Sequence, residues 1–362
     1  MRKRIESLDF LKAFLVLVVL VVHYCGTICF DDVSSDKNPA LFWFTSILSG
    51  FFRGNSVPIY FVISGYLFFL SGRFSMEEFY RKLRRRIKSL LIPYIIWNTL
   101  AIIMLVIVLL SPFVSMMKYG EEVNFSIGNL LSCYWIYDGG FAGVNIPTST
   151  APINMPLWYI RDLIVMVLLS PAIYWLLKKL GMIFLSLMCI LWIYYSIETA
   201  SVYVPREALF FFSLGAYFSV KGKDMVSIFS RYLKSSTILY LLVSIILGIV
   251  FFYEIENWSY LNLLNIVIGV VFYISFFEYL SHGSIINTAR KYFDVAFFIY
   301  LSHGLICSKM IKLIMILLKP SSDFGYIMTD VLSYIISILL LYGVYMLIKR
   351  LTPRVLSVML GR

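Results

Sequence analysis

The chain has 362 residues, of which 60% are hydrophobic and only 14% are charged, and its formal net charge is +11. A soluble domain carries about a quarter charged residues and about half apolar ones, so this composition excludes an ordinary soluble fold. The Lys and Arg residues stand in short clusters between apolar runs, which is typical of cytoplasmic membrane loops rather than of a nucleic-acid-binding surface. The apolar runs are unbroken, so they predict spanning helices and not the alternating strands of a barrel.

Apolar segments suited to crossing a bilayer, for which a helix needs about 20 residues, follow one another along the chain. The first run extends from about Phe10 to Phe30, which is too long for a signal peptide, and no A-x-A-like site follows it. We therefore expect an all-α polytopic integral membrane helical bundle with about ten transmembrane helices, in a single domain over residues 1–362. The predicted spans are residues 9–29, 41–71, 90–111, 157–177, 181–198, 206–220, 236–253, 261–280, 293–316 and 327–348.

The loops between these spans alternate in charge. Basic residues precede the first predicted span, at Arg2, Lys3 and Arg4, and they cluster again after every second span. The opposite loops carry mainly Asp and Glu. Cytoplasmic loops are enriched in Lys and Arg, so the pattern predicts that both termini are cytoplasmic.

Two segments depart from regular spans. The second span is too long for one straight helix and is interrupted by Gly54, Asn55 and Pro58. We expect either a broken or re-entrant element that lines a cavity, or a short amphipathic helix at the outer surface followed by an ordinary span. The long external loop at about 112–156 is polar, and external loops of this length are usually functional or disordered.

Ionisable residues inside predicted spans are costly and usually face the bundle interior. Lys12 and His23 stand eleven residues apart in the first span. That spacing places them on one helix face, within about 20° of each other and ~16 Å apart along the axis. The pattern suits a cation that holds an anionic donor and an imidazole that does chemistry deeper in the membrane. Alternatively, Lys12 snorkels and His23 is a hydrogen-bonded core residue. His303, in the ninth span, is a second candidate catalytic residue.

The densest charge in the chain is the basic run at residues 79–88. Such a run beside a span is usually a topology signal or a contact with anionic lipids. It is equally suited to bind the phosphates of a coenzyme, since Arg is a bidentate phosphate ligand. The candidate phosphate ligands in the run are Arg81, Arg84, Arg85 and Arg86.

A further charged pair, Arg161 and Asp162, follows Trp158 near the outer end of the fourth span. These three residues are candidates for binding a glycan or phosphate. Alternatively, the two charges neutralise each other, and Trp158 with Tyr159 belongs to the interfacial aromatic belt.

The sequence contains no phosphate-cradling glycine loop, no G-x-S-x-G motif, no metal-ligand cluster and no paired-carboxylate site.

Five motifs, taken in order, resemble one known family. The first two are Leu8-Asp9-Phe10-Leu11-Lys12 with His23, and Val57-Pro58-Ile59-Tyr60-Phe61-Val62-Ile63-Ser64-Gly65-Tyr66. The third is the basic run that leads into Ile92-Pro93-Tyr94. The last two are Leu157-Trp158-Tyr159-Ile160-Arg161-Asp162-Leu163 and Phe298-Ile299-Tyr300-Leu301-Ser302-His303. With the predicted spans, they resemble the acyltransferase-3 family of bacterial membrane acyltransferases, which modify cell-envelope glycans and similar acceptors. The family usually has Arg where this chain has Lys12. Its R-x-x-R motif is met by Arg81 and Arg84, whereas counting back from Pro93 selects Arg85 with Lys88, or Arg86.

The resemblance implies a protein of the bacterial inner membrane that moves an acyl group, commonly acetyl from acetyl-CoA, onto a hydroxyl of a cell-envelope or lipid-linked glycan. It implies no metal. His23 would act as general base or first relay the acyl group, since a neutral imidazole suits either role. Lys12 and the basic run would hold the phosphates of the coenzyme, and Ser64 would help to position the acyl carbonyl.

Two other classes of function fit the same residues. A transporter or flippase of a lipid-linked glycan would also use intramembrane charges and a broken helix, although the sequence shows no inverted repeat. A non-catalytic membrane sensor or assembly partner is the third reading. Transfer of a labelled acetyl group distinguishes the enzyme from both.

Overall fold

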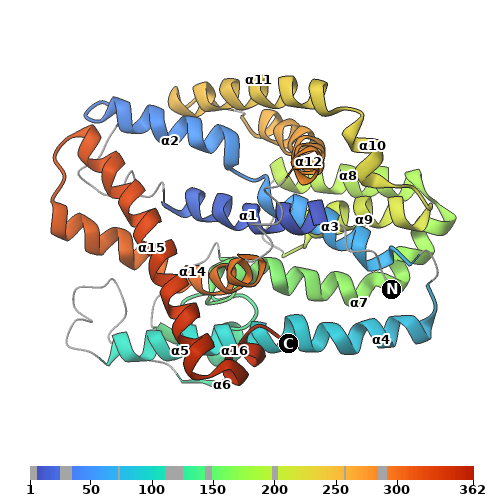
Figure 1. Cartoon of the computed structure of the whole chain (residues 1–362), viewed down its shortest axis with the longest axis horizontal. Helices are drawn as coiled ribbons and strands as arrows, with labels where there is room; N and C mark the ends of the chain where they lie inside the picture. The colour runs from blue at the N-terminus through green and yellow to red at the C-terminus, as the bar shows by residue number, and fades with distance from the viewer. Residues whose placement is uncertain are drawn as a thin grey trace.

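The computed structural model describes residues 6–24, 35–71, 74–110, 125–142, 149–197, 203–256, 258–283 and 292–362. The regular elements in these ranges are all helices, which confirms the all-α prediction (Figure 1). The basic residues 2–4, the end of the first predicted span and residues 112–124 and 143–148 of the external loop lie outside the described ranges. The longer helices are α1 (Glu6–Tyr24), α2 (Pro39–Phe52), α3 (Ser56–Phe69), α4 (Met76–Arg86), α5 (Ile92–Leu109), α7 (Trp158–Lys179), α8 (Met182–Ile197), α9 (Arg206–Val220), α11 (Leu233–Phe252), α12 (Ser259–Ser281), α14 (Phe293–Leu318) and α15 (Asp323–Leu351). The shorter elements are the π-helical turn η2 (Ile87–Leu91), α6 (Ile127–Ser132), η4 (Gly140–Ala142), η5 (Met155–Leu157), α10 (Met225–Ser230) and α16 (Pro353–Met359).

The predicted spans coincide with helices of this fold. Among the described residues, five helices are long and apolar enough to cross a membrane, or six if the two halves of α14, bent by 54°, form one span. The chain is therefore a multi-pass membrane protein, while the count of ten spans and the side of each terminus remain predictions. The five helices are Met76–Leu109, Met155–Lys179, Leu233–Phe252, Ser259–Ser281 and Asp323–Leu351.

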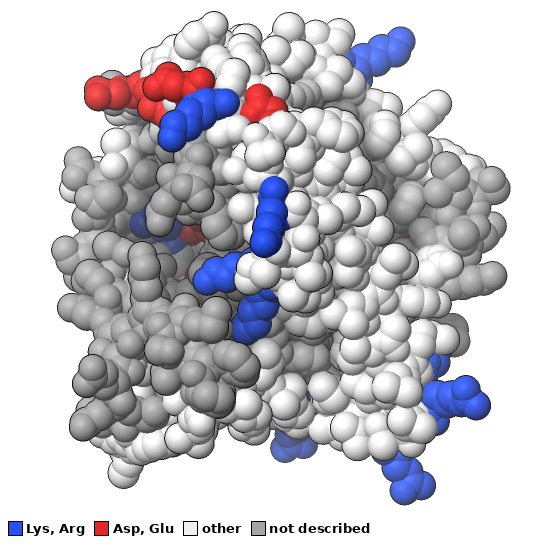
Figure 2. Space-filling model, turned by 90° about the vertical axis from the view of Figure 1, so that its left-hand side faces the viewer, with Lys and Arg blue, Asp and Glu red and all other residues white. Residues whose placement is uncertain are grey.

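Large apolar side chains point outward from several of these helices. Ile107 on α5, Ile190 on α8 and Leu339 on α15 are each more than 60% exposed. Exposure of this kind is unfavourable in water and is relieved by lipid. Among the side chains that Figure 2 colours on one end of the molecule, the acidic ones gather near the upper edge and the Lys and Arg side chains are spread over the rest.

The second predicted span is broken, as one of the two sequence expectations has it. The helices α2 and α3 are separated at Arg53–Asn55, where Gly54 has a φ of +80°. The helix α2 lies along the spanning helix α11, with the Trp43 ring stacked on Phe252 at a centroid distance of 4.0 Å. A helix that runs alongside a spanning helix is oriented across the membrane and does not lie flat on its outer surface, so the structure favours the broken element.

The helices α3 and α9 approach each other at the backbone. A Cβ atom at Gly65 would lie 2.0 Å from the carbonyl oxygen of Phe212, and one at Gly215 would lie 1.9 Å from that of Val62. Small residues allow membrane helices to pack this closely. The contact fixes the rotation of α3 and thereby the face on which Tyr60 and Ser64 lie.

The helix α1 occupies the interior of the bundle. It runs through the middle of the view in Figure 1, with α2 and α11 above it and α7, α4 and α5 below it. It packs against α14, α12, α2, α3 and α15. Leu11, Leu15 and Leu20 are fully buried in these contacts. Much of α1 is therefore enclosed by other helices.

Candidate active site

A cavity of about 400 Å³ opens between α1, α3, α7 and α14, next to the basic run. Lys12 of α1 and Arg86 at the end of α4 both line it, as does Ser64 of α3. Its walls are otherwise largely apolar. The cavity thus brings together residues from three motifs that are far apart in the sequence.

The acidic and basic residues of the cavity wall are paired. The ammonium of Lys12 lies 2.6 Å from a carboxylate oxygen of Asp9, one turn earlier in α1. Arg362 donates a hydrogen bond to Asp294, the second residue of α14. That hydrogen bond raises the pKa of the Arg362 guanidinium, which is cationic at neutral pH in any case. Among the described residues that line the cavity, cations outnumber carboxylates, so the cavity favours an anionic ligand.

The placement of Arg86 follows from the local helix geometry. The helix α4 begins at the N-cap Ser75, whose hydroxyl accepts a hydrogen bond from the Glu78 amide at 3.1 Å. Arg84, Arg85 and Arg86 occupy its last turn, where cations are favoured by the helix dipole. The π-helical turn η2 follows at once. Turns of this kind are frequent at functional sites. Arg86 lines the cavity, whereas Arg84 and Arg85 are exposed and do not line it.

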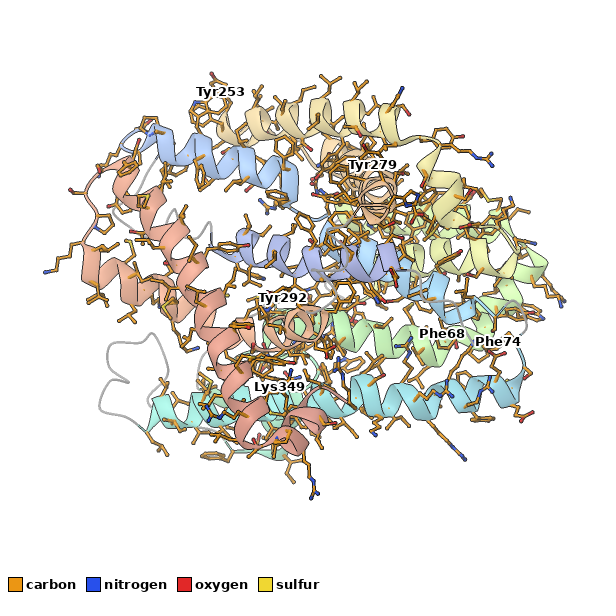
Figure 3. The ribbon with its side chains drawn as sticks, viewed as in Figure 1. Phe68, Phe74, Tyr253, Tyr279, Tyr292 and Lys349 are labelled. Carbon is orange, nitrogen blue, oxygen red and sulfur yellow. The ribbon has the colours of Figure 1, made fainter. Side chains whose placement is uncertain are left out.

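Two other residues of the basic run have structural contacts. Arg81 is exposed and lies 3.8 Å from Glu78. The ammonium of Lys82 donates a hydrogen bond of 2.6 Å to the Phe68 carbonyl. It also lies 4.9 Å from the centroid of the Phe68 ring and 5.8 Å from that of Phe74, two rings at the right-hand end of the molecule in Figure 3. Of the four arginines that the sequence offered as phosphate ligands, only Arg86 reaches the cavity.

Three tyrosines form one wall of the cavity. The rings of Tyr60 and Tyr159 have centroids 5.4 Å apart, and that of Tyr300 lies 6.3 Å from Tyr60 and 6.1 Å from Tyr159. The Tyr60 hydroxyl donates to the Lys12 carbonyl at 2.6 Å, and the Tyr300 hydroxyl donates to the Pro156 carbonyl at 2.6 Å. The Tyr159 hydroxyl lies 3.2 Å from Ser64 Oγ, within hydrogen-bond distance. These bonds hold the three rings between the cavity and His303.

The two candidate catalytic histidines lie together beyond this wall. The Tyr300 ring is 5.9 Å from that of His303, and the His303 ring is 5.3 Å from that of His23. His303 is fully buried, while His23 near the end of α1 is exposed. The structure thus places both residues in one cluster, with His23 on the accessible side.

The hydrogen bonds of His303 define its neutral tautomer. Its Nδ1 atom lies 2.7 Å from the carbonyl oxygen of Tyr300. Since a carbonyl oxygen only accepts, Nδ1 carries the proton and Nε2 keeps a lone pair. Nε2 is buried and has no hydrogen-bond partner among the described residues. A buried acceptor without a partner costs about 1–3 kcal/mol, so this atom is suited to accept a hydrogen bond from a group that enters the site.

The pair Arg161 and Asp162 faces the external loop and not the cavity. Arg161 is 2% exposed, and its Nη1 atom donates to the carbonyls of Trp135 at 2.5 Å and Thr150 at 2.8 Å. Its Nε atom donates to Asp162 at 3.0 Å, and the Tyr203 hydroxyl donates to the same carboxylate. Burial and the nearby carboxylate raise the pKa of Tyr203, which stays protonated as that donor. The pair anchors the external loop to the start of α7.

Several further residues differ from the sequence-based expectations or were not singled out there. Trp158 is half-buried on α7 and does not line the cavity. Tyr159, for which the sequence offered the aromatic belt as one of two interpretations, lines the cavity. Tyr60 and Tyr300 were also missed, although each tyrosine stands within one of the quoted motifs. Asp294, at the start of the ninth predicted span, and Arg362, in the basic segment after the tenth, were not singled out in the sequence.

The chemistry available here is proton transfer beside an anion-binding cavity. In the part of the chain that the structure describes, no group of three or more His, Cys, Asp or Glu side chains is placed to hold a metal ion. The cations at one end of the cavity suit phosphates. The tyrosine wall separates them from the imidazoles, and Tyr300 contacts both regions.

Comparisons with known proteins agree with the motifs. A family model described as an acyltransferase domain matches residues 5–348 of the chain. The succinoglycan biosynthesis protein ExoH of Rhizobium meliloti (strain 1021) is 21% identical over 197 residues, which cover 54% of this chain and 49% of that protein. The chain thus spans about half the length of the curated relative it matches. No solved structure matches the chain.

Proposed function

Because the chain belongs to this acyltransferase family, we propose that it is an O-acyltransferase of the bacterial inner membrane. In this proposal it moves an acyl group, acetyl in the first instance, from a cytoplasmic acyl-CoA to a hydroxyl of a cell-envelope or lipid-linked glycan. The glycan acceptor is suggested by the relative, whose name assigns it to succinoglycan biosynthesis.

The observation that carries the proposal is the continuity between a cationic cavity and a histidine pair. Lys12 and Arg86 line the cavity, and Tyr300 lines it as well. Tyr300 contacts His303, which contacts His23. An acyl-CoA has an anionic end and a reactive thioester end, and this arrangement offers a matching environment to each.

The residues of the cavity fit the donor chemically. Arg86 and Lys12 supply cationic donors for phosphate oxygens, and hydrogen bonds between such partners are stronger than neutral ones. The apolar wall suits the pantetheine arm. The Ser64 and Tyr159 hydroxyls, 3.2 Å apart, are available to donate a hydrogen bond to the acyl carbonyl.

The proposed reaction needs one base and no redox partner. The acceptor hydroxyl oxygen forms a bond to the acyl carbon while an imidazole takes its proton, and the carbon–sulfur bond breaks. The thiolate of coenzyme A then receives the proton. His23 is exposed and therefore accessible to the acceptor, and the unpartnered Nε2 of His303 provides a hydrogen-bond acceptor behind it. General base catalysis by a placed imidazole contributes about 100- to 10,000-fold.

Purified protein in lipid nanodiscs, given acetyl-CoA labelled in the acetyl group together with envelope glycan, tests the proposal. We expect covalent label in the glycan and its loss in the His23→Ala variant. Full transfer by His23→Ala would overturn the mechanism. Movement of labelled glycan across vesicles without any acetyl transfer would overturn the enzyme in favour of a transporter.

A further inference from the structure

The donor cavity has a wall that none of the motifs supplies. Leu360, Gly361 and Arg362, which follow α16, line it together with residues of α1 and α14. The helix α16 packs against α5, and the Trp97 indole donates to the Met359 carbonyl at 3.2 Å. This segment therefore closes the side of the cavity at the start of α5.

Gly361 seats the segment closely against the basic run. Its φ is +70°, in the left-handed region that favours glycine. A Cβ atom at this position would lie 2.4 Å from the Lys88 carbonyl oxygen and 2.7 Å from Ser89 Cα. Any other residue would have to move the chain away. The close contact holds Arg362 at the cavity, near the turn that carries Arg86.

Arg362 is held in an ion pair in which a stronger anion can replace Asp294. Its guanidinium binds the Asp294 carboxylate, and the two side chains are 49% and 50% exposed. An ion pair as exposed as this contributes little, since water and salt screen it. A phosphate group carries more charge than a carboxylate and accepts two parallel hydrogen bonds from a guanidinium. Exchange of Asp294 for a phosphate oxygen is therefore favourable.

We propose that Arg362 is a further phosphate ligand of the donor site and that Asp294 holds its guanidinium until the donor arrives. The inference rests on the proposed function, because the phosphates are those of the acyl-CoA. Asp294 lines the cavity itself, so the carboxylate competes with the donor for the same guanidinium.

Because Asp294 competes with the donor for Arg362, substitutions of these two residues should have opposite effects on donor affinity. Arg362→Ala removes a ligand and should weaken binding of coenzyme A about tenfold, the effect expected for loss of a charge-assisted hydrogen bond at a partly exposed site. Asp294→Asn removes the competitor and should strengthen binding about two- to fivefold. If the ion pair were only structural, both variants would weaken binding. In the Arg362→Ala background the gain from Asp294→Asn should disappear, as a double-mutant cycle measures.

The experiment measures binding of labelled coenzyme A to purified full-length variants in nanodiscs. Arg354→Ala is the matched control, because this arginine lies on α16 but is exposed and outside the cavity. A parallel assay uses acetyl-pantetheine, which has no phosphate, as donor. Arg362→Ala should lower transfer from acetyl-CoA at low donor concentration and leave transfer from acetyl-pantetheine unchanged, with Arg362→Lys in between.

The outcomes separate this inference from the proposed function. Unchanged coenzyme A affinity in Arg362→Ala, or equal losses with both donors, would overturn the role of Arg362 and leave the enzyme proposal intact. A wild-type protein that binds no coenzyme A and transfers from neither donor would overturn the enzyme proposal. If Arg362→Ala does not purify as a single species, Asp294→Asn still decides, because weaker binding in that variant contradicts the inference.

Discussion

The imidazole rings of His23 and His303 lie with their centroids 5.3 Å apart and their planes inclined by 46°. They come from the first and the ninth predicted spans, which meet because α1 packs against α14. Their environments differ, since His303 is fully buried and His23 is exposed. One imidazole is therefore exposed, and the other lies buried beside it with a fixed tautomer.

This arrangement predicts separate losses for the two histidines. His23→Ala and His303→Ala should each lower the transfer rate about 100- to 10,000-fold, the usual contribution of a placed acid or base. The rate of glycan acetylation at saturating acetyl-CoA measures it. His282→Ala is the control, because this exposed residue follows α12 and lines a separate pocket together with Glu6 and Asp224. Near wild-type rates in both variants would exclude imidazole catalysis.

The cavity predicts that the arginines of the basic run are not equivalent. Arg86→Ala should raise the KM for acetyl-CoA about tenfold or more, since a charge-assisted hydrogen bond to phosphate is lost. Arg84→Ala should change the KM less than about twofold, because the side chain is exposed and outside the cavity. Initial rates over a range of donor concentrations give the KM of each variant for acetyl-CoA. A larger effect at Arg84 would assign the phosphates to the outer face of α4.

The backbone contact between α3 and α9 predicts a strong effect of one methyl group. Gly65→Ala should destabilise the protein by about 1–3 kcal/mol or more, since the added carbon overlaps a carbonyl of α9 and the helices must separate. The fraction of monodisperse protein that survives heating in detergent measures it. Gly343→Ala on α15 is matched, because a Cβ there meets nothing within 4 Å. Equal stability of the two variants would contradict the close contact.

The buried pair at the start of α7 predicts a structural role for Arg161. Arg161→Ala leaves the Asp162 carboxylate buried without its guanidinium, which costs about 3–5 kcal/mol, and frees two carbonyls of the external loop. The loop should then be cut faster by a protease added from outside. Tyr203→Phe removes a single hydrogen bond and should have a smaller effect. Unchanged proteolysis in Arg161→Ala would leave the pair as a candidate glycan contact.

Much of the fold was accessible from the sequence because spans are local properties. Apolar length identifies a membrane helix wherever it packs, and the interruption at Gly54 and Asn55 is visible as composition. Lys12 and His23 share a face because helix geometry alone relates residues eleven apart. The motifs also contained the histidines and tyrosines that form the cluster at the site. Their sequence positions did not show that these residues lie together.

The tertiary structure decided which face of each helix turned inward. Tyr159 and Arg161 are two positions apart, yet the first lines the cavity and the second anchors the external loop. Among the arginines of the basic run, the end of α4 and the turn after it bring Arg86 alone to the cavity. Hydropathy sets how long a helix is, whereas its rotation depends on side-chain packing against neighbours that are distant in sequence. Contacts such as Gly65 with Phe212, and the seating of Gly361 beside Arg362, exist only once those neighbours are in place.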